Sequence, residues 1–281
     1  MRGLGAFLPE RLRLVDDPYG LRFARGLGAL FALPGVARRA GAASPIWMRG
    51  YLRRFAIYMQ LRTRVIDDDV AAFVRAGGRQ LVLLGAGFDC RAWRLAALTG
   101  ATVYEVDHPA TQKTKREIME SEASKGRVVF VPWDFEHEPL SALPERLKRE
   151  GHDASAPTMT ILEGVVMYLT APALDATLGC IARYSSPHSP LAVTYMESDL
   201  MRPLAARWAS GRALVRFVGE PFRSGFEPAR FADWLSARGF HLERDESAAE
   251  AGVRLLRLDA KRAKRLRKTL SHFALARRTD R

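Results

Sequence analysis

The chain has 281 residues, of which 48% are hydrophobic, so it is long enough to bury one large core. No apolar run approaches the ~20 residues of a membrane-spanning helix. The longest candidate, 26–37, is broken by Pro34, and this break also argues against a secretory signal. Two isolated cysteines, Cys90 and Cys180, exclude a disulfide framework and a cysteine zinc cluster. We therefore expect a cytoplasmic protein without a membrane span or a bound metal.

The net charge of +13 is concentrated at the two ends of the chain. Residues 1–64 carry twelve arginines against three acids, and residues 261–281 carry nine basic residues against one acid. Such ends are compatible with a nucleic-acid or anionic-surface partner, or with solvated helix faces in an arginine-rich protein. Because no zinc-finger, RNP or helix-turn-helix signature accompanies the charge, we expect solvated faces and no nucleic-acid partner. The sequence leaves the oligomeric state open.

The elements alternate in type along the chain. Residues 1–76 have apolar residues at helical spacing and predict an N-terminal helical cap. From residue 80 onward, short apolar runs predict strands at 80–84, 102–107, 127–134, 158–164 and 190–197. Helical segments are expected between most of them, at 109–122, 139–150 and 171–185. This alternation predicts an α/β fold with a parallel sheet covered on both faces.

The last third of the sequence is less regular. Residues 198–228 form a long excursion that we expect to fold over the strand ends on the substrate side. Residues 229–246 predict a helix, a glycine stop and a strand, and residues 253–260 the last strand. The predicted core thus spans 77–260. Residues 261–281 are expected to be a basic tail, so that removing 262–281 would leave ligand binding nearly unchanged.

A glycine turn follows the first predicted strand. Gly85, Ala86 and Gly87 stand where an open parallel sheet brings backbone close to a ligand, and glycine tolerates the positive φ of such turns. Asp107 ends the second strand about twenty residues later, where an acid accepts hydrogen bonds from ribose hydroxyls. This pair of features fits NAD as well as other nucleosides.

Two further features argue against NAD. Cys90 takes the place of the third glycine of the dinucleotide motif, which packs beneath a pyrophosphate. The third and fourth strands also end in acids, Asp134 and Glu163, which would repel a pyrophosphate. Carboxylates instead suit an adenine amino group or a cation. S-adenosylmethionine combines adenine, ribose and a sulfonium cation without a phosphate, and it is the cofactor that we expect.

Several motifs in order resemble the leucine carboxyl methyltransferase family, and in particular its bacterial branch of O-methyltransferases. They are LGAGFDCRAWRL (84–95), YEVDHP (104–109), LEGVVMYL (162–169), DDPYGLRFA (16–24), LRTRVIDDDV (61–70) and the segment 219–240. The resemblance covers about 16 to 258. It implies a Rossmann-like class I methyltransferase fold with a mostly parallel seven-stranded sheet, helices on both faces and the N-terminal helical cap.

The resemblance also implies roles for single residues. The implied cofactor-binding residues are Arg62 for the cofactor's carboxylate, Gly85, Ala86 and Gly87 beneath its methionine moiety, Asp107 for the ribose, Asp134 and Phe135 for the adenine, and Glu163 near the sulfonium. Tyr168 would face the substrate and, with Arg62, complete the catalytic set. Alternatives stay open: Arg62 as a surface residue, Asp134 as a helix cap and Tyr168 as a core residue. Arg91 and Arg94 are expected to form salt bridges or to lie under the first helix.

The chemistry that follows is methyl transfer to oxygen. A carboxylate acceptor is already ionised at neutral pH, whereas a phenol or alcohol usually needs a general base. His108 and His137 are expected on the surface, and the lack of a recruited histidine favours a carboxylate, although Glu197 remains a candidate base.

We therefore expect an S-adenosylmethionine-dependent O-methyltransferase acting on a carboxylate or hydroxyl of a small metabolite. The alternatives are a protein C-terminal carboxyl methyltransferase, a non-catalytic nucleic-acid- or surface-binding protein on the same fold, and an NAD-linked oxidoreductase.

Overall fold

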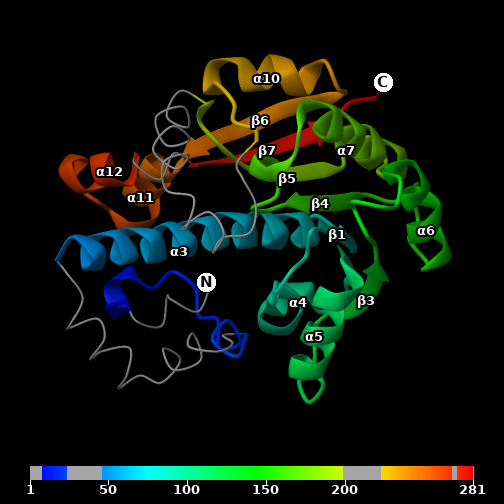
Figure 1. Ribbon diagram of the computed structural model, residues 1–281, viewed down its shortest axis with the longest axis horizontal. Helices are drawn as coiled ribbons and strands as arrows, with labels where there is room; N and C mark the ends of the chain where they lie inside the picture. The colour runs from blue at the N-terminus through cyan, green and yellow to red at the C-terminus, as the bar shows by residue number, and fades with distance from the viewer. Residues whose placement is uncertain (1–7, 24–45, 199–222, 268–270, 281) are drawn as a thin grey trace.

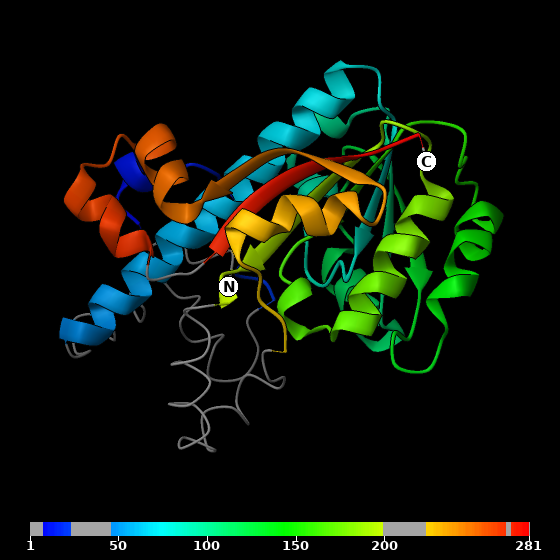
Figure 2. The ribbon, with the colours of Figure 1, turned by 90° about the horizontal axis from the view of Figure 1, so that it is seen from above.

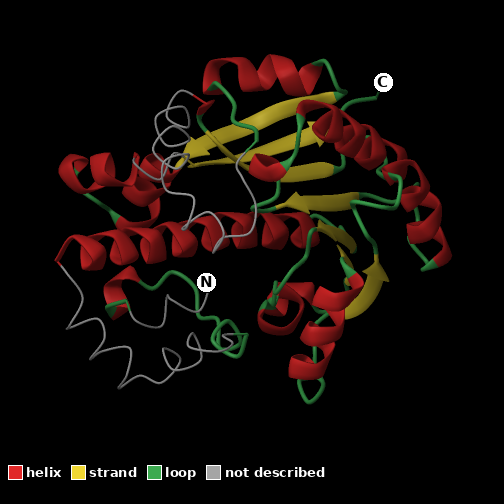
Figure 3. Cartoon of the chain, in the orientation of Figure 1, coloured by secondary structure: helices red, strands yellow, loops and turns green. Residues whose placement is uncertain are grey.

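The computed structural model describes residues 8–23, 46–198, 223–267 and 271–280. Its centre is a single seven-stranded sheet (Figure 3). The strands are β1 (Gln80–Leu84), β2 (Thr102–Asp107), β3 (Arg127–Pro132), β4 (Thr158–Leu162), β5 (Pro190–Met196), β6 (Phe240–Ser247) and β7 (Ser271–Arg278). Their order across the sheet is β3-β2-β1-β4-β5-β7-β6. All pairings are parallel except those of β7 with β5 and β6. The predicted mostly parallel sheet is confirmed.

Helices cover both faces of this sheet. The α-helices are α3 (Ile46–Arg75), α4 (Arg91–Arg94), α5 (Pro109–Met119), α6 (Leu143–Arg149), α7 (Ala171–Tyr184), α10 (Pro228–Ser236), α11 (Ala248–Leu256) and α12 (Ala260–Leu266). Short 3-10 helices are η2 (Glu10–Leu12), η3 (Ala96–Leu98), η4 (Leu140–Ala142) and η5 (Val166–Tyr168). Helices α6, α7 and α10 pack on one face, and α3, α4 and α5 on the other (Figure 1).

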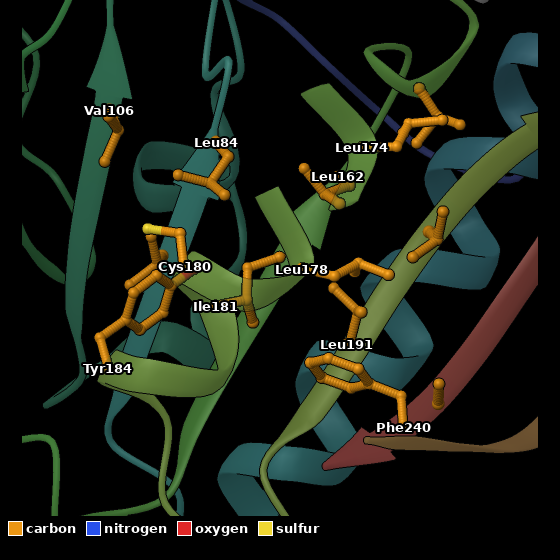
Figure 4. Packing of buried hydrophobic residues seen from close by; sticks show 14 of the residues in the cluster. Leu84, Val106, Leu162, Leu174, Leu178, Cys180, Ile181, Tyr184, Leu191 and Phe240 are labelled. Atoms are coloured by element: carbon orange, nitrogen blue, oxygen red, sulfur yellow. The ribbon is translucent and has the colours of Figure 1, made fainter. Parts of the chain in front are cut away.

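The central strands are apolar because both of their faces are covered. All five residues of β1 and all five of β4 are buried. On the α7 face, Leu84 and Leu162 pack with Leu178 and Ile181 of the helix (Figure 4). Removing such side chains from water contributes about 25 cal/mol per Å² of apolar area, which makes this layered packing the main stabilisation of the sheet.

The order of the strands creates a switch point between β1 and β4. From β1 the chain runs outward through β2 to β3, then returns to the other side of β1 with β4 and β5. Because the loops at the carboxyl ends of β1 and β4 therefore turn away from each other, a ligand-binding crevice is expected between them. This edge of the sheet is where the predicted site residues should gather.

Helix α3 is long enough to serve two packing partners. Its C-terminal half lies on the sheet through Ile66 and Val70, and its N-terminal half extends past the sheet to α11 and α12 (Figure 2). Together with η2 it is the described part of the predicted helical cap, since residues 24–45 lie outside the described ranges. No helix among the described residues combines the length and apolarity that crossing a membrane requires.

The C-terminal prediction was wrong in two respects. Residues 253–260 are not a strand: α11 continues to Leu256, and Asp259 caps α12. The last strand is β7, within the segment expected to be a basic tail, and it lies between β5 and β6. The alternation of apolar residues and arginines at 253–260 imitated a strand, whereas the Ser247–Glu250 capping box marks the start of a helix. The predicted excursion at 198–228 lies mostly outside the described residues.

Candidate active site

The glycine turn after β1 is held by β2. Gly85 and Gly87 adopt φ values of 70° and 50°, which favour glycine. The backbone N–H groups of Gly85 and Ala86 donate to the carbonyl of Val106, at 2.9 and 3.2 Å. Asp107 then accepts the Gly87 N–H on Oδ2 at 2.5 Å and the His108 N–H on Oδ1 at 2.7 Å. The predicted glycines and acid are therefore directly bonded to one another.

Space for a ligand lies over one of the two glycines. A Cβ atom on Gly85 would come within 2.8 Å of Val165 Cγ2, whereas one on Gly87 would meet nothing closer than a backbone oxygen at 4.0 Å. The next residue, Phe88, is 40% exposed and stacks on Phe23 with ring centroids 4.6 Å apart. The turn thus presents open backbone beside an aromatic pair, an arrangement that suits a flat or flexible organic ligand.

Below the turn lies a buried group of six charged residues, which we call the arginine cluster. Its members are Arg62, Asp67, Asp89, Arg91, Arg94 and Glu163. At its centre, Arg91 bonds Asp67 at 2.7 Å, Asp89 at 2.5 Å and Glu163 at 2.6 Å. Burial lowers the pKa of Arg91, but the three carboxylates outweigh burial and hold the pKa well above its ordinary value. Arg94 grips Asp67 with both terminal nitrogens, so the expectation that Arg91 and Arg94 form salt bridges is confirmed.

Arg62 is the member of the arginine cluster with donors to spare. Its Nε lies 2.7 Å from Glu163 Oε1, an ion pair without the alignment of a hydrogen bond, and its guanidinium lies over the Tyr58 ring. Within the described residues, its two terminal nitrogens have no hydrogen-bond acceptor. Only 13% of the side chain is exposed, which argues against a surface arginine. Arg64 points elsewhere: it pairs with Asp68, and both side chains are 44% exposed.

Asp134 and Phe135 follow β3 at the same edge of the sheet. Asp134 accepts the Glu136 N–H at 3.0 Å and lies 2.9 Å from His137 Nδ1, so it closes a turn, and no helix begins there. The contact with His137 lowers the pKa of Asp134 and raises that of His137. Phe135 is 42% exposed, so its ring is accessible to a ligand. The proposed adenine contact thus has an aromatic surface beside it.

Tyr168 lies in η5, just beyond Glu163. It is half-buried, so it is not simply a core residue. The backbone carbonyl of its neighbour Met167 accepts N–H bonds from Arg223 at 2.7 Å and Ser224 at 3.2 Å. The loop that carries Tyr168 is therefore tied to the chain at 223–226.

At this edge lies a second polar group, which we call the histidine cluster; of its members the sequence had indicated only Glu197, as a candidate base. It consists of Tyr195, Glu197, Asp245 and His272. His272 Nδ1 lies 3.0 Å from Asp245 Oδ1, and Nε2 lies 3.1 Å from Glu197 Oε1. Tyr195 donates its hydroxyl to the other oxygen of Asp245 and stacks on the His272 ring. Tyr195, Asp245 and His272 come from β5, β6 and β7, and Glu197 follows β5. The error in placing β7 removed His272 from consideration.

Comparison with known proteins identifies relatives along most of the chain. Residues 4–182 match the model of the family named "Leucine carboxyl methyltransferase". A protein of Streptomyces coelicolor named "Putative S-adenosyl-L-methionine-dependent methyltransferase" is 37% identical over 67% of this chain and 61% of its own length. A relative with the same designation in Frankia alni is 31% identical over 84% of this chain and 79% of its own. The chain thus spans less than two thirds of the Streptomyces relative.

Two solved structures share the architecture. A DUF574 family protein from Streptomyces avermitilis superposes with a TM-score of 0.60 at 19% identity, covering 87% of this chain and 91% of its own. A protein from Thermobifida fusca described as a putative methyltransferase gives the same TM-score and identity, covering 94% and 99%. At this identity the likeness establishes the fold, which is the expected Rossmann-like class I arrangement.

Proposed function

Because the chain belongs to the leucine carboxyl methyltransferase family, we propose that it is an S-adenosylmethionine-dependent O-methyltransferase acting on a carboxylate or hydroxyl of a small metabolite. The observation that carries this proposal is the direct bond between the glycine turn and the strand-end acid, Gly87 N–H to Asp107. It joins backbone open to a ligand with a carboxylate suited to ribose, and it lies beside the switch point of the sheet, at the ends of β1 and β2.

The residues present fit the cofactor on its nucleoside side. Each carboxylate oxygen of Asp107 accepts one backbone N–H and keeps a further lone pair, so both can still accept ribose hydroxyls. Phe135 offers an exposed ring to the adenine, next to Asp134.

They also fit the amino-acid end. The terminal nitrogens of Arg62, which bond no acceptor in the described part of the chain, would hold the cofactor's carboxylate, for which a guanidinium is the best-matched side chain. In this proposal Glu163 keeps Arg62 oriented, and Gly85, Ala86 and Gly87 form the floor of the site. When bound, the cofactor supplies an activated methyl group on its sulfonium.

The protein contributes by aligning the methyl donor with the acceptor and by excluding water from the site. Methyl transfer is an in-line displacement, so orientation of the two reactants and a dry site account for most of the acceleration. Arg62 and Asp107 fix the two ends of the cofactor, and Tyr168 in η5 borders the acceptor side next to the segment 223–226. A small-molecule acceptor is the partner that this arrangement needs.

Calorimetric titration with S-adenosylmethionine, S-adenosylhomocysteine and NAD tests the proposal. We expect the two adenosyl compounds to bind with micromolar dissociation constants, about −8 kcal/mol, and NAD not to bind. Thermal stability should rise with either adenosyl compound, since a ligand of the native state shifts the unfolding equilibrium. Stabilisation by NAD alone would refute the assignment, and salt-dependent retention on heparin would favour the surface-binding alternative.

A further inference from the structure

The histidine cluster stands at the acceptor side of the proposed site. We propose that Glu197 accepts the proton of a neutral, hydroxyl-bearing methyl acceptor, and that His272 and Asp245 position it for this task. This inference rests on the proposed function and narrows it: the acceptor is a phenol or alcohol and not a carboxylate.

The location of Glu197 supports this role. It follows β5 directly, at the same edge as Glu163, and the N–H of Gly164 donates to Thr194 of β5 at 2.8 Å. Glu197 also forms a parallel β-bridge with Phe226. Since Arg223 and Ser224 bond the carbonyl beside Tyr168, one short segment, 223–226, connects Glu197 to the predicted substrate-facing loop.

The exposure of the three side chains shows which end of the cluster is open. Glu197 is 28% exposed, Asp245 15% and His272 10%. Asp245 is further enclosed by the hydroxyl of Tyr195, whose pKa burial raises strongly. An incoming molecule can therefore reach Glu197, whereas Asp245 is the inner anchor of the histidine ring.

The charge of the cluster selects the acceptor. Each ring nitrogen of His272 faces a carboxylate, and a nitrogen must carry a proton to donate to one, so the two contacts together fit an imidazolium. Although burial lowers the pKa of His272, the hydrogen bonds and charges of Asp245 and Glu197 raise it overall. One imidazolium with two carboxylates leaves a net charge of −1. An anionic acceptor would be repelled, while a hydroxyl can donate to Glu197.

The step balances without a further reagent. The acceptor oxygen forms its bond to the methyl carbon as the bond from carbon to sulfur breaks and its electron pair stays on sulfur. The hydroxyl proton passes to the Glu197 carboxylate, the cluster becomes neutral, and water later takes the proton. A carboxylate acceptor would need no such group, so the cluster would then have no chemical use.

The test compares Glu197→Gln with Glu246→Gln in the 281-residue chain. Glu246 is a matched control, because it lies in β6 next to Asp245 but is ion-paired with Arg254. S-adenosylhomocysteine release from S-adenosylmethionine is measured with two mixtures, one of simple phenols and alcohols and one of the corresponding carboxylic acids. Binding of S-adenosylhomocysteine is measured in parallel for every variant.

We expect the wild type to use the hydroxyl mixture. Glu197→Gln should slow transfer by about 10²- to 10⁴-fold, the usual effect of a general base, with cofactor binding within twofold of wild type. Glu246→Gln should transfer at the wild-type rate. His272→Gln should shift the acid limb of the pH–rate profile, because the imidazolium no longer faces the base. A purely structural histidine would not move that limb.

Three results would overturn the inference, provided that the protein still binds the cofactor. They are methyl transfer to the acid mixture alone, transfer to neither mixture, and full activity of Glu197→Gln. If the wild type does not bind the cofactor, the proposed function itself is refuted. The two failures are therefore distinguishable.

Discussion

The arginine cluster and the histidine cluster lie at the same edge of one sheet but differ in charge balance and in exposure to solvent. In the arginine cluster, three guanidinium groups face three carboxylates, and Arg91 is only 1% exposed. In the histidine cluster, one imidazole faces two carboxylates and Glu197 remains accessible. A balanced, buried cluster holds shape, whereas an unbalanced, open one is suited to exchanging a proton.

The two clusters also divide the chain. Every member of the arginine cluster lies within residues 4–182, which match the family model, and every member of the histidine cluster lies beyond them. The family part of the chain thus carries the features suited to the common cofactor. The remainder, with β5, β6 and β7, would set which acceptor is used.

The largest expected effect follows from the position of β7. A chain ending at Arg267 lacks the strand between β5 and β6, and with it the buried residues Phe273, Ala274 and Ala276. This loss should exceed the roughly 5–15 kcal/mol that stabilises a typical domain, so we expect no cooperative thermal transition by circular dichroism. A chain lacking only residues 280–281 should melt like the wild type. Cooperative melting of the shorter chain would mean that β7 is dispensable, as the sequence alone suggested.

The second prediction concerns the centre of the arginine cluster. Arg91→Leu would leave Asp67, Asp89 and Glu163 buried around an apolar side chain. Breaking a buried ion pair in this way costs about 3–5 kcal/mol of unfolding free energy, measured by chemical denaturation. Arg64→Leu is the control, and it should cost less than about 1 kcal/mol, because its pair with Asp68 is largely exposed. Equal costs for the two variants would show that the cluster is not tightly coupled.

These cases show what could be predicted from the sequence. The strands β1 to β5 were predicted correctly because buried parallel strands are continuous apolar runs. The strand β7 was missed because its apolar stretch, 273–276, is short, half alanine and flanked by basic residues. Nothing in a local pattern indicates that two neighbouring strands will enclose it.

The site residues likewise divide into those that connectivity brings together and those that depend on strand register. Gly85, Gly87 and Asp107 lie on consecutive strand ends of one parallel unit, so their proximity follows from connectivity. The bonds among Tyr195, Asp245 and His272 depend on the antiparallel register of β7 with both neighbours. Register is fixed by tertiary packing, so that cluster became visible only in three dimensions.

The third prediction tests the cofactor role of Arg62. Losing one side of a charge-assisted pair in a closed site costs about 2–5 kcal/mol of binding free energy, so Arg62→Ala should weaken S-adenosylhomocysteine binding by that amount. Arg62→Lys should also weaken it, since lysine lacks the planar fork that matches a carboxylate. Arg64→Ala, measured in the same calorimetric series, should change binding little. A larger effect at Arg64 would place the cofactor on the other side of α3.

The fourth prediction concerns Asp107, which acts on both the ligand and the turn. Asp107→Ala should weaken S-adenosylhomocysteine binding by about 1.5–3 kcal/mol, because hydrogen bonds to a charged group contribute that much. It should also lower stability by about 1 kcal/mol, since the N–H groups of Gly87 and His108 lose their acceptor. Normal binding in this variant would assign Asp107 to the turn alone.

The smallest expected effect separates the two clusters by pH. Burial lowers the pKa of His272, but the hydrogen bonds and charges of Asp245 and Glu197 outweigh burial and raise the pKa above its ordinary value of 6.5. Tyr195 stacks on the histidine ring, and Glu250 is also nearby. The stabilisation from this imidazolium is therefore complete below pH 6.5 and is lost as the pH rises through the folded-state pKa. In the arginine cluster, the carboxylates hold the pKa of Arg91 well above its ordinary value, so its charge does not change in that range.

This pH dependence is measured as a difference between two proteins. Unfolding free energies of the wild type and His272→Gln are compared from pH 6 to pH 9, and the excess stability of the wild type should shrink as the pH rises. The difference is needed because a second group also titrates. Burial raises the pKa of Glu105 to about 7, against the effect of Lys115, so the free energy of unfolding also falls as the pH rises from 4.5 to 7. Both proteins share the contribution of Glu105, and it cancels. A difference that stays constant, or grows with pH, would mean that His272 is neutral, and the histidine cluster would then carry two negative charges instead of one.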